Sequence, residues 1–199
     1  MAKFKFSCTK CGECCDNRTP VPLTLQDLDD WSTKKVINNI FPYIKIGMNQ
    51  DGIAMLVLDV IEESKDGDDA DDKKERIGKC PMYNKETKTC LIWANRPTYC
   101  RAFPLGFNGD NYVIEMDDCP GLESVEEMDK ELLKNMRDDA KTLFEGIRSL
   151  GITLPILQGV IMRTLQEENM KIMSKLSQED MEKLGNIMQK MSGEQEETK

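Results

Sequence analysis

The sequence predicts an α+β protein: a small cysteine-rich domain of short strands and helices, followed by a C-terminal segment of about three α-helices. Two observations carry this prediction. All eight cysteines lie within the first 119 of 199 residues, among short extended and helical patterns broken by proline and glycine. After residue 122 the cysteines stop and apolar residues recur at helical spacing. We expect a cysteine-cluster domain at 1–122, a helical segment at 123–191 and a flexible polar tail at 192–199.

Two short helices are expected after the first cysteines. Thr24 is a suitable N-cap residue, and Asp27 stands three positions later, in the position that closes a capping box. The first helix should reach about Trp31. A second should cover 34–40, because Pro42 removes the backbone donor that a longer helix would need.

Residues 53–61 are mostly apolar and predict a strand that is buried on much of both faces. The next segment, 62–76, has no apolar periodicity and carries five aspartates within 66–72. We interpret it as a solvated acidic loop. A hard-cation site is the alternative, but the order of its carboxylates and glycine does not fit a calcium-binding loop.

The middle of the chain predicts a hairpin, a helical turn and another strand. The polar stretch between Cys80 and Cys90 suggests a hairpin that brings these two cysteines together. Pro97 suits the opening of a short helical turn, which would point Cys100 toward the same place. Residues 111–116 predict a strand.

The C-terminal segment predicts helices at 123–149, 154–176 and 177–191, the last opened by a capping box at Ser177 and Asp180. This segment is rich in methionine, whose flexible side chain suits adaptable contacts with a partner protein, although filling a core is the simpler role. The methionines concerned are Met162, Met170, Met173, Met181, Met188 and Met191.

The most informative local pattern is the run of four cysteines Cys8, Cys11, Cys14 and Cys15. A thiol at every third position lets a tight loop aim several sulfurs at one point, as a soft metal ion or an iron–sulfur cluster requires. The chain contains no histidine. A soft-metal site must therefore be built from thiolates, with backbone, water or carboxylate as the other ligands.

Eight thiols divide naturally into two sets of four. We group Cys8, Cys11 and Cys14 with one remote cysteine, and Cys15 with the other three, because neighbouring side chains point in divergent directions. Both Cys80 and Cys119 precede a proline, as the remote ligand of ferredoxin-like loops does. A single site with spare buried cysteines is the alternative. The predicted metal ligands are Cys8, Cys11, Cys14, Cys15, Cys80, Cys90, Cys100 and Cys119.

Iron and zinc both accept four thiolates, so the ligand type does not separate them. The tight triple step favours an iron–sulfur cluster of the 4Fe-4S type, with zinc as the alternative cofactor, because zinc sites more often use two separated Cys-x-x-Cys pairs. Arg96 and Arg101 flank Cys100 and are candidate cofactor-binding residues that neutralise thiolate charge. The other interpretation of both arginines is an ordinary ion pair with an Asp or Glu side chain.

The composition indicates the cellular compartment and the classes of partner to expect. The formal net charge is −9, and thiolate clusters would make it more negative, so a nucleic-acid partner is not expected. No apolar stretch is long enough to suggest a secretory signal or a membrane span. We expect a cytoplasmic protein, since a reducing compartment keeps eight cysteines as thiols.

Three blocks of this sequence resemble one known family. They read Cys8-x-x-Cys11-x-x-Cys14-Cys15, then Cys80-Pro, then Cys90-Leu-Ile-Trp-x-x-Arg96-Pro97-x-x-Cys100-Arg101-x-Phe103-Pro104. The family is the CxxCxxCC family of zinc- or iron-chelating domains, the YkgJ-like cysteine-cluster proteins, and the resemblance covers about residues 4–121. It implies a module that binds metal or an iron–sulfur cluster, with flagellin lysine N-methylase as one related activity.

The leading functional hypothesis is a protein with one or two iron–sulfur clusters that serves electron transfer, cluster handling or a larger redox complex. A zinc-stabilised adaptor is the alternative, and a protein-lysine N-methylase using S-adenosylmethionine is the third. The chain has no Gly-x-Gly turn for a nucleoside and no Cys-x-x-x-Cys-x-x-Cys motif for radical chemistry, and it offers no nameable catalytic residue. A thiol–disulfide oxidoreductase would need a βαβ context that is not visible here.

Overall fold

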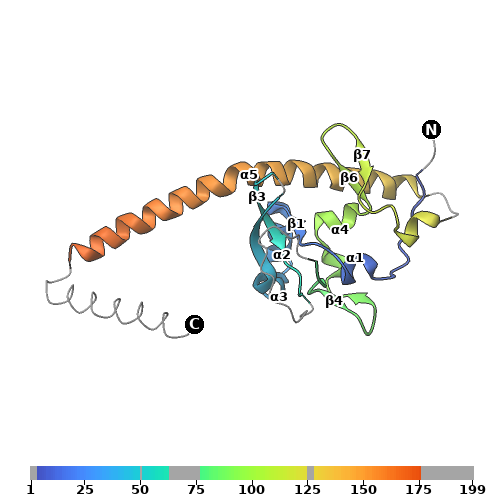
Figure 1. The fold of residues 1–199 in the computed structure, drawn as a ribbon, viewed down its shortest axis with the longest axis horizontal. Helices are drawn as coiled ribbons and strands as arrows, with labels where there is room; N and C mark the ends of the chain where they lie inside the picture. Colours follow the sequence, from blue (N-terminus) through green and yellow to red (C-terminus); the bar gives the residue numbers. More distant parts are fainter. Residues whose placement is uncertain (1–3, 50, 63–76, 125–127, 176–199) are drawn as a thin grey trace. The chain divides into compact units, whose positions relative to one another are not determined.

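The computed structural model describes residues 4–49, 51–62, 77–124 and 128–175. Within them, short antiparallel strands and short helices are followed by one long helix, which confirms the predicted α+β class (Figure 1). The chain divides into two compact units, Met1–Leu154 and Pro155–Lys199. Most of the predicted acidic loop, the third helix at 177–191 and the tail at 192–199 lie outside the described residues.

A three-stranded antiparallel sheet consists of β1 (Val21–Leu23), β2 (Ile44–Met48) and β3 (Ala54–Leu58), in the order β1-β3-β2. The predicted strand at 53–61 is therefore present as the central strand β3, but it ends earlier. Beyond Leu58 the chain leaves the sheet, and Ile61 forms an isolated bridge with Lys79. The bridge therefore places Lys79, the residue before Cys80, beside Ile61.

The predicted capping box is present at the start of α2 (Leu25–Thr33). The Asp27 amide donates to the Thr24 hydroxyl over 3.2 Å, and the Thr24 amide donates to the Asp27 carboxylate over 2.8 Å. The second helix, α3 (Ile37–Ile40), is shorter than the predicted 34–40 and is followed by a 3₁₀ turn, η1 (Phe41–Tyr43). Its late start has a backbone cause, since Lys35 has a φ of 59° and interrupts the helical path.

The predicted hairpin, helical turn and strand of the middle region are all present. The elements are β4 (Tyr83–Asn84), β5 (Thr89–Cys90), η2 (Trp93–Asn95), α4 (Thr98–Ala102), β6 (Leu105–Phe107), β7 (Tyr112–Ile114) and η3 (Pro120–Glu123). Two antiparallel pairs, β4–β5 and β6–β7, form the hairpins.

The two helices expected at 123–149 and 154–176 are one continuous helix, α5 (Lys130–Met173), with Pro155 inside it. It begins later than expected because the Asp129 carboxylate accepts from the amides of Glu131 and Leu132 and so caps the helix. An interior proline removes one backbone donor and crowds the preceding turn, but the helix continues through Pro155 in the structure. The domain boundary at 122–123 stays a prediction.

The hydrophobic core lies in the first unit between the three-stranded sheet, α2 and the β4–β5 hairpin. Trp31 is 1% exposed, and its indole Nε1 donates to the Asn95 carbonyl over 2.7 Å. The buried core residues are Val21, Leu23, Trp31, Ile40, Leu58, Cys80, Met82, Tyr83 and Ile92. On α5, the buried side chains are Met136, Ala140, Leu143 and Leu150. Cys80 is therefore a member of the core as well as a candidate ligand.

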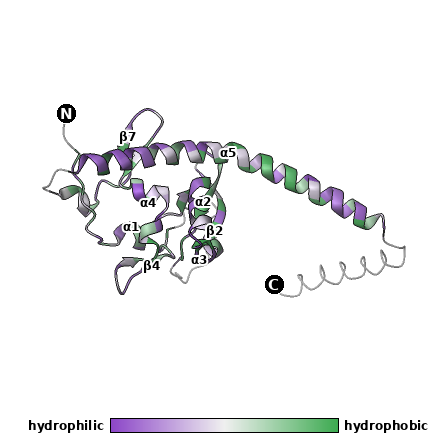
Figure 2. Ribbon diagram, turned by 180° about the vertical axis from the view of Figure 1, so that it is seen from behind, coloured by the Kyte–Doolittle hydropathy of each residue, from purple (hydrophilic) through white to green (hydrophobic). Residues whose placement is uncertain are grey.

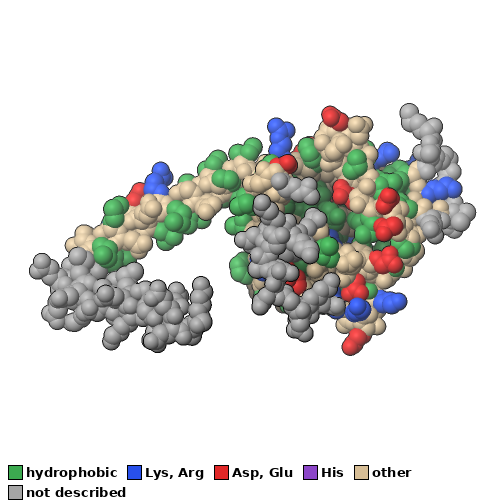
Figure 3. All heavy atoms as spheres, viewed as in Figure 1, with side chains coloured by type: hydrophobic (Ala, Val, Ile, Leu, Met, Phe, Trp, Pro, Cys, Tyr) green, Lys and Arg blue, Asp and Glu red, His purple; other side chains and the backbone are tan. Residues whose placement is uncertain are grey.

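Beyond Pro155, the described part of α5 presents many apolar side chains to solvent (Figures 2 and 3). They include Ile156, Leu157, Val160, Ile161, Met162, Leu165, Met170, Ile172 and Met173. None of the helices in the described segments combines the length and the apolar character that crossing a membrane requires.

Candidate metal centre

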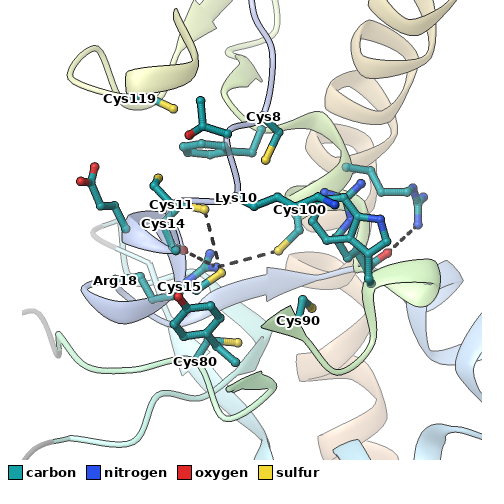
Figure 4. Close-up of a pocket in the computed structure, with 18 of the residues that line it drawn as sticks. Cys8, Lys10, Cys11, Cys14, Cys15, Arg18, Cys80, Cys90, Cys100 and Cys119 are labelled. Carbon is teal, nitrogen blue, oxygen red and sulfur yellow. Dashed lines mark hydrogen bonds between the residues drawn. The ribbon is translucent and has the colours of Figure 1, made fainter. Parts of the chain in front are cut away.

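All eight cysteines line one cavity of about 530 Å³ in the first unit (Figure 4). All eight are free thiols. The structure thus brings Cys80, Cys90, Cys100 and Cys119 to the loop that carries the first four, as the sequence analysis expected. The volume is of the size that accommodates small-molecule ligands and far exceeds the space that one ion occupies.

The N-terminal loop is curled by two residues in the left-handed region. Lys10 has a φ of 56° and Gly12 a φ of 88°, and α1 (Glu13–Asp16) starts directly afterwards. The Cys15 amide donates to the Gly12 carbonyl over 2.8 Å, which closes the turn. This curl explains how sulfurs only three residues apart reach one cavity.

Gly12 is required for packing as well as for backbone conformation. A Cβ at this position would overlap the hydroxyl and ring of Tyr83, which lies against the loop. We expect Gly12→Ala to displace the loop, to lower its metal content and to reduce the free energy of unfolding by at least about 1 kcal/mol.

Gly52→Ala is the matched control for that substitution. Gly52 also has a positive φ, 74°, but nothing lies within 4 Å of the position that a Cβ would occupy there. Metal content and thermal unfolding of the two variants therefore separate backbone strain from the Tyr83 overlap. Equal behaviour of the two variants would show that Tyr83 does not constrain the loop.

Backbone hydrogen bonds attach the middle block to the N-terminal loop. The Cys80 amide donates to the Cys15 carbonyl over 2.7 Å, and Arg18 and Gly78 form an isolated antiparallel bridge. Cys90 pairs with Tyr83 across the β4–β5 hairpin. These contacts carry Cys80 and Cys90 to the cavity from a segment more than sixty positions along the chain.

Asp27 positions the helix that carries Cys100. One oxygen of its buried carboxylate accepts from the Thr98 amide and hydroxyl, both over 2.7 Å, at the first turn of α4. Its other oxygen accepts from the amide and hydroxyl of Thr24. One carboxylate therefore caps α2 and fixes α4 beside it.

Arg18 is a site residue that the sequence analysis did not single out. Its Nη1 donates to the Cys14 carbonyl over 2.9 Å and to the Cys100 sulfur over 3.8 Å, and its guanidinium lies 5.4 Å from the Tyr99 ring centroid. Burial acts to lower the pKa of Arg18, but the negative charge on Cys100 and other neighbours raises it. The sequence signal that could have identified Arg18 is its position, three residues after Cys15 in an acidic chain.

Both predicted arginines line the cavity, but each has another neighbour. Arg101 forms an ion pair with Asp139 of α5, with an Nη2–Oδ1 distance of 3.0 Å, which is the pairing that the sequence analysis gave as the other interpretation. Arg96 lies over the Trp93 ring, 3.8 Å from its centroid. Contact of either arginine with a bound cofactor stays a prediction.

The charge of the cavity lining is opposite to that of the protein. Five cationic side chains and one acidic side chain, Glu13, line it, whereas the whole chain has a net charge of −9. The cationic residues are Lys10, Arg18, Lys88, Arg96 and Arg101. Such a lining suits an anionic occupant, and metal centres with four thiolate ligands are anionic.

The cysteines differ in their readiness to lose a proton. Cys14 and Cys15 share a hydrogen bond with an Sγ–Sγ distance of 3.9 Å, and the Cys15 thiol lowers the pKa of Cys14 to about 6. The same bond raises the pKa of Cys15. Burial raises the pKa of Cys80 to about 11, so a metal would have to displace its proton at neutral pH. In the described residues, no three cysteine or acidic side chains already stand at the spacing of one metal ion.

Comparison with known families gives one match. The model of the CxxCxxCC family, described as "Putative zinc- or iron-chelating domain", matches residues 7–120. The chain belongs to the CxxCxxCC family. Neither the comparison with curated proteins nor that with solved structures finds a match.

Every cysteine of the chain lies inside the matched region, since the first is Cys8 and the last is Cys119. The residues that define this CxxCxxCC protein are therefore the residues that line the cavity. The matched region is the cysteine-rich part, which the family description names as zinc- or iron-chelating, whereas α5 lies outside the family model.

Proposed function

We propose that the eight cysteines hold iron–sulfur clusters of the 4Fe-4S type, and that this protein serves electron transfer, cluster handling or a redox complex in the cytoplasm. The observation that carries the proposal is the cavity itself: eight free thiols surround about 530 Å³ of space with a largely cationic lining. A cluster of several atoms uses this space better than a single ion. When bound, such a cluster supplies a one-electron redox centre.

The chain's own residues have three tasks in this proposal. The thiolates bind the iron, and the lowered pKa of Cys14 favours its thiolate form. The Arg18 guanidinium compensates negative charge and donates a hydrogen bond to the Cys100 sulfur, an interaction that tunes cluster potentials. The core around Cys80 keeps water from one side of the site.

A zinc-stabilised adaptor is the second candidate. The family description names zinc beside iron, and zinc readily accepts four thiolate ligands.

Binding of a partner protein through the C-terminal helices stays a prediction. The exposed apolar side chains of α5 beyond Pro155, three of them methionines, support it. A nucleic-acid partner is not expected for a chain of net charge −9.

Reduction of the anaerobically purified protein separates the two candidates. We expect dithionite to bleach the visible absorption and a mild oxidant to restore it, because a 4Fe-4S cluster accepts and returns one electron. Zinc has no accessible redox state, so a zinc protein would show no change. A metal-loaded protein whose spectrum does not respond to dithionite would contradict the iron–sulfur proposal.

A further inference from the structure

We infer that the cavity contains two separate four-thiolate sites with a defined membership. The inner site consists of Cys15, Cys80, Cys90 and Cys100. The outer site consists of Cys8, Cys11, Cys14 and Cys119. This inference rests on the proposed metal-binding function and identifies Cys119 as the remote cysteine that completes the N-terminal loop.

Packing against the hydrophobic core distinguishes the inner four cysteines. Cys80 is a buried member of the core cluster, and the three other cysteines of the inner site pack directly against that cluster. Among the described residues that form this core cluster or pack against it, none is one of the outer four cysteines. The core therefore supports one group of four thiols and leaves the other group at the open side of the cavity.

Backbone contacts hold the inner cysteines together. The Cys80 amide donates to the Cys15 carbonyl over 2.7 Å, and the Tyr83 amide donates to the Cys80 carbonyl over 3.0 Å. Tyr83 in turn pairs with Cys90 across the hairpin. One continuous set of main-chain contacts thus joins the segments that carry three of the four inner ligands.

Arg18 links the fourth inner ligand to this set. The arginine bridges to Gly78, two residues before Cys80, and its Nη1 donates to the Cys100 sulfur over 3.8 Å. The same Nη1 donates to the carbonyl of Cys14, an outer ligand. Arg18 therefore lies between the two sites, where a cation reduces the repulsion between two anionic centres.

A different contact holds the outer site. The amide of Ser7, the residue before Cys8, donates to the carbonyl of Gly121 over 3.0 Å. The two segments approach so closely that a Cβ on Gly121 would overlap the Ser7 carbonyl and the Phe6 ring. Cys119, two residues before this glycine, is thus held beside the N-terminal loop (Figure 4).

Pairs of serine substitutions test the membership. We expect Cys119→Ser and Cys90→Ser each to lose about half of the bound metal, because each removes one site. The double variant Cys8→Ser/Cys119→Ser should lose no more than Cys119→Ser, since both residues serve the outer site. The double variant Cys90→Ser/Cys119→Ser should lose all of it. Thr9→Ala, inside the loop but without a thiol, is the control and should keep the full content.

Circular dichroism of each variant checks that the fold is intact, and Cys15→Ser replaces Cys90→Ser if the latter does not fold. A single substitution that removes all metal, or a wild-type protein with metal for one site only, would overturn the inference. A double variant with both substitutions in one site that loses more metal than the corresponding single variant would also overturn the inference. If the wild type holds zinc and the zinc content halves in this pattern, the two sites stand and the iron–sulfur proposal fails. If the wild type holds iron–sulfur clusters but the metal content of the variants does not follow this pattern, the iron–sulfur proposal stands and the two-site inference fails.

Discussion

Removal of the metal is expected to unfold the N-terminal loop and the segment around Cys119, the cysteine-bearing parts that lie outside the hydrophobic core. Metal sites whose ligands come from distant segments are coupled to folding, and structural sites contribute on the order of 10 kcal/mol in small domains. Here the ligands join the N-terminal loop to segments beyond residue 77. Among the described residues, the main-chain hydrogen bonds between these segments include those from Ser7 to Gly121 and from Cys80 to Cys15.

Hydrogen exchange of the metal-loaded and the chelated protein measures this effect by position. We expect residues 4–14 and 117–124 to lose protection on chelation, whereas β1, β2, β3 and the β4–β5 hairpin keep theirs because they share the core around Trp31. Restoring the metal should restore protection, which is the control for irreversible damage. Identical exchange with and without metal would show that the metal does not stabilise the domain.

Asp27→Asn is expected to cause the largest loss of stability of any single polar substitution discussed. The buried carboxylate accepts four hydrogen bonds, two from Thr24 and two from Thr98. An asparagine would turn its NH₂ group toward one of these pairs of donors and leave them unsatisfied. Two bonds at about 1.5–3 kcal/mol for each hydrogen bond to a charged group give an expected loss of about 3–6 kcal/mol.

Thermal unfolding checks this expectation, with a decrease in Tm of roughly 6–24 °C for a chain of this size. Asp29→Asn is the matched control, since Asp29 lies on the same helix with an exposed side chain and should leave Tm almost unchanged. Because Thr98 opens the helix of Cys100, Asp27→Asn should also lower the metal content. A Tm within about 1–2 °C of the wild type would contradict the role given to this carboxylate.

Local signals in the sequence predicted the elements that depend on local physics. The cap at Thr24, the hairpin between Cys80 and Cys90 and the helical turn after Pro97 each follow from a few neighbouring residues, and all are present. Convergence of eight cysteines on one cavity was also expected, since the loop alone offered too few ligands for two sites.

Features that depend on distant contacts were not predictable in this way. The capping box identified Asp27, but its second set of bonds to Thr98 joins residues 71 positions apart. Arg18 gains its role only because the chain brings Cys100 beside it. The continuity of α5 through Pro155 was not predicted, because a proline more often opens or ends a helix, although it removes only one donor.

The central claim is that the cavity of eight thiols is an iron–sulfur site, and elemental analysis tests it most directly. Iron, acid-labile sulfide and zinc should be measured in protein purified without oxygen, together with the visible spectrum. We predict iron and sulfide in equal amounts, a brown protein and little zinc. A colourless protein that contains one or two zinc ions and no sulfide would contradict the claim.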